Sequence, residues 1–173
     1  RVIRLDVVPR RIKDKDEFLK FAIETCKRLV KETGESRVRF GIENHGGTTN
    51  DAEFLEKLLD GVGSRRVGVT LDTGNLYWFG YPLGELYGIY EKFAPRVFHT
   101  HCKSIAYPPE RQNEKRTMGF EYAKYNCPVY AGDIDFKRVV AILRKAKYTG
   151  ALCIENESLG RFPKEARREV MAK

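Results

Sequence analysis

The stretch that decides the fold of this chain is VGVTLDTGN, residues 67–75. It begins as a short run of β-branched and apolar residues, which is typical of a buried strand. It ends on Asp72, which is followed by turn-forming residues. Four further strand-like runs occur along the chain, at residues 2–8, 38–43, 96–102 and 151–155. The sequence therefore predicts five strands, most of which end in a polar side chain.

Segments with the periodicity of amphipathic helices lie between these strands. The expected helices begin near Asp14, Asn50, Gly84, Asp135 and Pro163. Strict alternation of strands and helices predicts a parallel α/β sheet, either a barrel or a doubly wound sheet, in one domain over residues 1–173. The polar segment 104–132 is far longer than an ordinary connection, and such loops are often functional.

Composition excludes several classes of protein. Hydrophobic residues make up 42% of the chain and charged residues 32%, which is typical of a folded globular domain. No apolar run approaches the roughly 20 residues that a membrane span needs. The four cysteines form no C-x-x-C pair, which argues against a structural zinc site, and their wide spacing suggests no disulfide framework, which favours a reducing, cytoplasmic compartment. The formal net charge is +8, but the positive residues are scattered, so we expect a solvated surface and no nucleic-acid partner.

Metal-binding side chains stand at the ends of four successive strands. The carboxyl ends of parallel strands share one rim of the sheet, so these side chains should meet. They are Glu43, Asp72, His101 and Glu155. Three crowded carboxylates repel one another unless a cation neutralises them. Oxygen ligands with one imidazole suit Mn²⁺, Mg²⁺, Co²⁺ or Zn²⁺, so the sequence predicts one divalent metal ion.

Further polar residues near these strand ends are candidate substrate contacts. They are Asn44, His45, Asn75, His99 and Lys103. His99 and Lys103 alternate with His101, so all three side chains point to the same face of their strand. A lysine at such a position can bind a hydroxyl or a phosphate, or stabilise an enediolate oxygen.

Several of these residues also have a structural explanation. Glu43 could interact with a helix dipole, and Asp72 could cap the turn that follows it. Glu157 shares a face with Glu155, and we prefer Glu155 because the strand should end there. A group of aromatic residues follows Asp72 and could line a sugar site or simply pack the loop. They are Tyr77, Trp78, Phe79 and Tyr81.

Five stretches, taken in order, carry a family resemblance. They are GIENHGG (41–47), LDTGN (71–75), HTHCK (99–103), GDID (132–135) and GALCIE (150–155). Together they resemble the xylose isomerase-like TIM-barrel superfamily of sugar phosphate isomerases and epimerases. The resemblance implies that Glu43, Asp72, His101 and Glu155 bind one divalent metal. In the similar ketohexose 3-epimerases two glutamates also exchange the substrate proton, which implies that role for Glu43 and Glu155.

The chain departs from the family pattern in two ways. The family barrel has eight strands, and the five runs here look like strands four to eight, the C-terminal portion of a (β/α)₈ barrel. We expect residues before Arg1, or another copy in a homo-oligomer, to cover the first strand's open edge. The apurinic endonuclease branch also needs more histidines, one of them three residues after the aspartate, where this chain has Asn75.

Our main interpretation is a divalent-metal-dependent isomerase or epimerase of a sugar, sugar phosphate or polyol, working through an enediolate. The metal would acidify a C–H bond between a carbonyl and a hydroxyl, and a glutamate would move the proton. The alternative is a lyase, such as a dehydratase, on the same site. An endonuclease-like hydrolase and a non-catalytic binding module are further alternatives.

Overall fold

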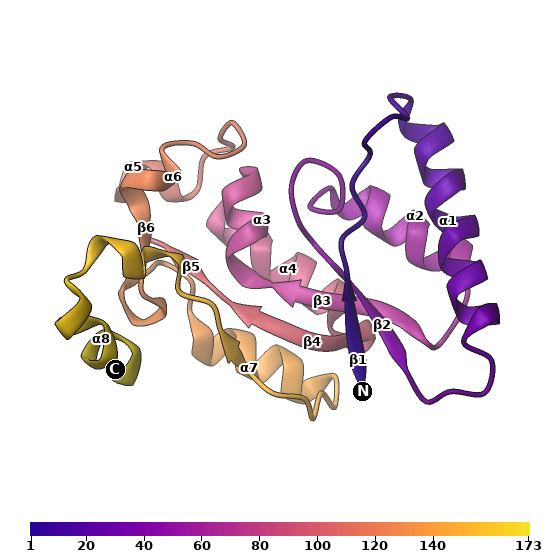
Figure 1. Ribbon diagram of the computed structural model, residues 1–173. Helices are drawn as coiled ribbons and strands as arrows, with labels where there is room; N and C mark the ends of the chain where they lie inside the picture. Colours follow the sequence, from indigo (N-terminus) through magenta and orange to yellow (C-terminus); the bar gives the residue numbers. More distant parts are fainter.

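In a computed structural model that describes residues 1–173, five parallel strands form one open sheet in the order of the chain (Figure 1). The strands are β1 (Val2–Leu5), β2 (Arg39–Glu43), β3 (Val67–Asp72), β4 (Val97–Cys102) and β7 (Cys153–Ile154). All four pairings are parallel. This half-barrel confirms the expected partial TIM barrel and rules out a doubly wound sheet, in which the strand order would reverse.

Helices connect the strands and cover the outer face of the sheet (Figure 1). They are α1 (Lys15–Glu32), α2 (Ala52–Val62), α3 (Thr73–Phe79), α4 (Leu83–Phe93) and α7 (Phe136–Lys145). Helix α1 packs against α2, and α4 packs against α7. Aspartate side chains cap three of these helices as expected, since Asp14, Asp51 and Asp135 accept hydrogen bonds from backbone N–H groups of the first turn.

The core lies between the sheet and the helices and centres on β3. All six residues of this strand are buried, as parallel strands covered on both faces should be. Val69 and Leu71 share one cluster with Leu55 and Leu58 of α2. Burying a side chain of this size stabilises a fold by about 1.5–3 kcal/mol, so β3 is fixed firmly enough to present Asp72 at its end.

The polar segment 104–132 folds back along the C-terminal part of the chain (Figure 1). It contains a short antiparallel pair, β5 (Ser104–Ile105) with β6 (Asn126–Cys127). Two single-turn helices lie between these strands, α5 (Pro109–Gln112) and α6 (Tyr122–Tyr125). Strand β6 contacts the 3₁₀ helix Glu157–Arg161 that follows β7, which brings this segment to the rim of the sheet.

Several element boundaries differ from the sequence prediction. The first strand ends at Leu5 and not at Val8, and Ile3 at the open edge keeps an exposed fraction of 48%. The last strand has only two residues. Helix α3 follows Asp72 directly, where we expected a turn. The tail is a 3₁₀ turn and a short helix, α8 (Arg167–Ala172). None of the helices combines the length and apolarity needed to cross a membrane.

Candidate metal centre

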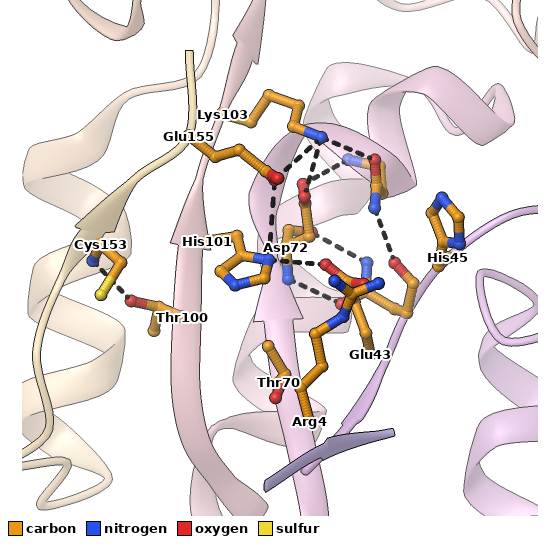
Figure 2. Close-up of polar contacts among 12 residues, drawn as sticks. Arg4, Glu43, His45, Thr70, Asp72, Thr100, His101, Lys103, Cys153 and Glu155 are labelled. Carbon is orange, nitrogen blue, oxygen red and sulfur yellow. Dashed lines mark hydrogen bonds and ion pairs between the residues drawn. The ribbon is translucent and has the colours of Figure 1, made fainter. Parts of the chain in front are cut away.

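Four side chains from β2, β3, β4 and the end of β7 meet at the carboxyl rim of the sheet (Figure 2). They are Glu43, Asp72, His101 and Glu155, and each offers a ligand atom within 4.8 Å of the others. The strand register explains this proximity, because Asp72 lies opposite His101 in the β3–β4 pair. The structure therefore brings together the four residues that the sequence selected as metal ligands.

Glu43 is the most firmly held of the three carboxylates. Its Oε1 lies 2.6 Å from His101 Nδ1, and its Oε2 lies 2.6 Å from Arg4 Nε. The side chain is buried, whereas that of Arg4 is 45% exposed. The hydrogen bond that His101 donates to Glu43 raises the pKa of His101 above its ordinary value, because it stabilises the protonated ring. Both oxygens of Glu43 thus have partners.

Asp72 and Glu155 each carry a buried oxygen without a hydrogen-bond partner, Asp72 Oδ2 and Glu155 Oε2. An unsatisfied buried carboxylate oxygen is costly and needs a compensating charge. Burial raises the pKa of Asp72, since the charged carboxylate is removed from water. Both oxygens share a single nearby ammonium, that of Lys103, at 3.2 and 3.1 Å. Together with a third carboxylate and an imidazole they fit a divalent cation, which supplies more positive charge than one ammonium does.

Lys103 is the cationic residue nearest to these oxygens. Its ammonium nitrogen lies 3.2 Å from Asp72 Oδ2 and 3.1 Å from Glu155 Oε2 (Figure 2). It also lies 2.7 Å from Glu157 Oε1. Although burial acts to lower it, the pKa of Lys103 is raised, because Asp72, Glu157 and Glu155 favour the charged form. The side chain predicted to face the site from β4 therefore lies among its carboxylates in its charged form.

Asn44 ties the end of β2 to the end of β3. Its Oδ1 accepts a 2.8 Å hydrogen bond from the backbone N–H of Asp72, and its Nδ2 donates to the Asp72 carbonyl at 2.8 Å and to Asn50 Oδ1 at 3.1 Å. The residue is 1% exposed. This differs from the substrate contact that we expected, because the amide is fully used inside the protein.

Asn75, His99 and His45, the other expected substrate contacts, lie around the four candidate metal ligands. Asn75 is buried and accepts a 3.4 Å hydrogen bond from Lys103 Nζ, while its amide donates to the Asn44 carbonyl. His99 stacks edge-on against His101, with 5.3 Å between the ring centroids, and burial lowers its pKa. His45 is about half exposed and lies 3.1 Å from Asp6 at the side of the cluster (Figure 2).

Sequence reasoning missed two residues that touch the site, Arg4 and Tyr122. Arg4 pairs with Glu43, and the Tyr122 hydroxyl donates a hydrogen bond to Glu157. Alternation along the first strand could have found Arg4, because residues 4 and 6 share one face. Nothing in the local pattern of the long loop singles out Tyr122. Glu157, set aside in favour of Glu155, proves to be the closest partner of Lys103.

Of the four aromatic residues after Asp72, Tyr77 packs in the interior, and Trp78, Phe79 and Tyr81 are partly exposed. Tyr77 is fully buried, its hydroxyl donates to Asp133 at 2.9 Å, and its ring contacts that of Tyr107 edge-on. A pocket of about 610 Å³ lies at the opposite end of the strands, where Val67 and Phe98 line it. None of the predicted site residues lines this pocket, so it is separate from the cluster at the carboxyl rim.

A parallel half-barrel with this set of side chains at its carboxyl rim defines an α/β barrel whose chemistry lies at the strand ends. The chain matches the model of the xylose isomerase-like TIM barrel over residues 2–172. It belongs to that family, as the resemblance of its strand ends predicted.

Two curated relatives are inosose dehydratases. That of Bacillus velezensis is 27% identical over 158 residues, which are 88% of this chain and 52% of the relative. That of Bacillus thuringiensis (strain Al Hakam) is 30% identical over 146 residues, 82% of this chain and 48% of the relative. The chain thus spans about half the length of the curated relatives it matches.

Solved structures share the fold. The IOLI protein with a bound zinc atom superposes with a TM-score of 0.72 at 16% identity, covering 99% of this chain and 60% of that one. A D-tagatose 3-epimerase-like protein gives 0.67 at 20% identity, covering 99% and 62%. A xylose isomerase-like protein of Mycobacterium smegmatis in complex with magnesium gives 0.67 at 16% identity, covering 99% and 60%. Two of these three neighbours contain a divalent metal.

Proposed function

We propose that this chain forms the metal-binding half of a dehydratase, a lyase that removes water from a keto form of a cyclic polyol such as inosose. The observation that carries the proposal is the convergence of Glu43, Asp72, His101 and Glu155 within 4.8 Å. Both curated relatives described above are inosose dehydratases. Of the two reactions weighed from the sequence, the relatives thus favour the lyase over the isomerase or epimerase that we preferred.

In this proposal the four side chains hold one divalent ion, Mn²⁺, Mg²⁺, Co²⁺ or Zn²⁺. When bound, such an ion polarises a carbonyl oxygen and so acidifies the neighbouring C–H bond. Zinc in one structural neighbour and magnesium in another support a metal of this class without selecting one.

Glu155 is the group best placed to take the proton from carbon. Its side chain is 41% exposed and so can reach a substrate at the rim, whereas both oxygens of Glu43 are held by His101 and Arg4. The family resemblance implied that both glutamates exchange the substrate proton, whereas this proposal gives that role to Glu155 alone. Glu43 then acts as a fixed ligand, and Glu155 as the base.

Lys103 is the group best placed to assist the departing hydroxyl. Loss of water breaks one C–O bond, and the oxygen leaves with a proton supplied by a nearby acid. The Lys103 ammonium can give that proton, and it lies 3.1 Å from Glu155, which has taken one from carbon. Transfer between the two groups restores both, so the cycle balances with water as the only added product.

An epimerase is the second candidate, supported by the fold shared with a D-tagatose 3-epimerase-like protein. Inverting a carbon centre requires a proton to leave from one face and to arrive at the other, so two free acid–base groups are needed. The double engagement of Glu43 by Arg4 and His101 favours the lyase, because it leaves Glu155, whose Oε2 has no hydrogen-bond partner, as the one available carboxylate of the pair.

The test is to incubate the purified protein and each metal separately with an inosose and with a ketohexose in D₂O. Loss of water gives an enone, which absorbs in the ultraviolet, whereas epimerisation incorporates deuterium without loss of water. We expect the enone from inosose alone, and Glu155→Gln should abolish it. Deuterated ketohexose without any enone would contradict the lyase and support the epimerase.

A further inference from the structure

Lys103 reaches two groups of acidic side chains with a single ammonium. One group is Asp72 Oδ2 and Glu155 Oε2, at 3.2 and 3.1 Å (Figure 2). The other is Glu157 Oε1, at 2.7 Å. Only the contacts with Glu157 and Asn75 satisfy hydrogen-bond geometry. Unit charges this close attract or repel strongly in a buried setting, so the position of this ammonium determines how much negative charge Asp72 and Glu155 can offer to a metal.

The base of the Lys103 side chain is fixed, so only its end can move. The Thr73 hydroxyl donates to the Lys103 carbonyl at 2.6 Å and accepts from its N–H at 3.0 Å. The stem passes directly over Gly74, where a Cβ atom would lie 2.8 Å from Lys103 Cγ. Because only 7% of the side chain is exposed, the ammonium has little access to water. It can therefore shift only among its acidic partners.

Glu157 is itself held from two sides. Its Oε1 accepts from Lys103, and its Oε2 accepts from the Tyr122 hydroxyl. It begins a 3₁₀ turn whose preceding residue, Asn156, caps the backbone N–H of Ser158 at 3.0 Å. Tyr122 belongs to the long loop 104–132, so one hydrogen-bonded chain connects that loop to the candidate metal ligands.

We propose that Glu157, held by Tyr122, is a positioning residue that draws the Lys103 ammonium toward itself and leaves Asp72 and Glu155 free to bind a divalent cation. Without Glu157 the ammonium would pair fully with these two carboxylates and compete with the metal for them. The inference rests on the metal site of the proposed function, but it does not depend on which reaction that site performs.

The test is a double-mutant cycle read out by calorimetric titration of Mn²⁺. We expect Glu157→Ala to weaken Mn²⁺ binding about tenfold when Lys103 is present, and by less than about twofold in a Lys103→Met background. The Mn²⁺ affinity of Glu157→Gln should lie between those of the parent protein and Glu157→Ala, because glutamine retains an acceptor for Lys103 but loses the charge. Tyr122→Phe should weaken binding in the same direction and by a smaller factor.

Glu165→Ala is the matched control, because Glu165 is exposed and its replacement removes the same charge from the C-terminal segment. It should leave Mn²⁺ affinity unchanged. Equal losses from Glu157→Ala in both Lys103 backgrounds would overturn the proposal, because Glu157 would then act only by shaping the turn around Glu155. No loss in either background would overturn it as well. Failure of every variant and of the parent to bind Mn²⁺ would instead refute the metal site itself.

Discussion

Asp72 accepts a 2.8 Å hydrogen bond from the backbone N–H of Asn75 and so caps helix α3 with the same side chain that faces the candidate metal ligands. The two tasks use different atoms, Oδ1 for the cap and Oδ2 for the site. The sequence left capping and metal binding open as alternatives for this residue. The structure makes them compatible, because a short helix begins directly where β3 ends.

Asp72→Asn should separate these tasks. Asparagine caps a helix as well as aspartate does, and Lys103 keeps its other acidic partners, so the free energy of unfolding should change by less than about 2 kcal/mol. The loss of a charged ligand should weaken Mn²⁺ binding at least about 100-fold, measured by calorimetry. Asp72→Ala is the comparison, since it should lose metal and helix cap together. Unchanged Mn²⁺ affinity in Asp72→Asn would mean that the residue serves only as a cap.

Asn44→Ala should destabilise the protein by about 2–4 kcal/mol, because it removes three buried hydrogen bonds and leaves the backbone N–H of Asp72 without a partner. Urea unfolding followed by circular dichroism measures the change. Asn113→Ala removes one exposed hydrogen bond to the Gly84 N–H and should cost less than about 1 kcal/mol. Similar stabilities for the two variants would show that Asn44 does not link the strand ends.

Sequence reasoning predicted the sheet and the cluster because both follow from short-range pattern. The β-branched runs predicted the parallel strands, and the rule that the carboxyl ends of parallel strands share a rim placed Glu43, Asp72 and His101 at one point. Side-chain alternation placed Lys103 on the same face as His101. These inferences need only the periodicity of apolar residues and the order of the strands along the chain, and both can be read directly from the sequence.

Contacts made by loops and amides could not be predicted in the same way. Tyr122 reaches Glu157 only because the 104–132 loop folds back onto the end of β7, and that path depends on tertiary packing. Asn44 has the same polar groups whether it binds a substrate or links two strands, so its role depends on what lies within 3 Å. The short helix after Asp72 was missed because its Gly and Asn residues are weak helix formers.

Gly74→Ala should displace Lys103. A Cβ at this position would lie 2.9 Å from Lys103 Cβ and 2.8 Å from Cγ, closer than side chains approach, so the lysine stem must shift. We expect a loss of about 1–3 kcal/mol in the free energy of unfolding. Gly88→Ala is a matched control in helix α4, where an added Cβ meets nothing within 4 Å and should stabilise by about 0.5–1 kcal/mol. Equal effects of the two substitutions would refute the close approach of Lys103 to α3.

Arg116 anchors the long loop to helix α3. The residue is buried, and its guanidinium lies between the rings of Tyr77 and Tyr107, 4.5 and 4.4 Å from their centroids. Its two terminal nitrogens donate to backbone carbonyls on both sides of the contact, those of Arg111, Gln112, Glu114, Tyr77 and Tyr81. No carboxylate pairs with it, so the loop is held by geometry and aromatic contact and not by charge neutralisation.

Arg116→Lys should therefore loosen the loop although it preserves the charge, because an ammonium offers three donors at one point and cannot span both sets of carbonyls. We expect backbone amides of residues 104–132 to exchange hydrogen at least about tenfold faster while those of β3 stay protected. Arg111→Lys is the matched control within the same loop, since that side chain is 40% exposed and its contacts, an ion pair with Glu114 and a cation–π contact with Phe120, can also be made by an ammonium. The loosened loop should also release Tyr122 from Glu157, so Mn²⁺ binding should weaken in the same direction as in Tyr122→Phe. Unchanged exchange in Arg116→Lys would show that the β5–β6 pair, and not this guanidinium, holds the loop against the sheet.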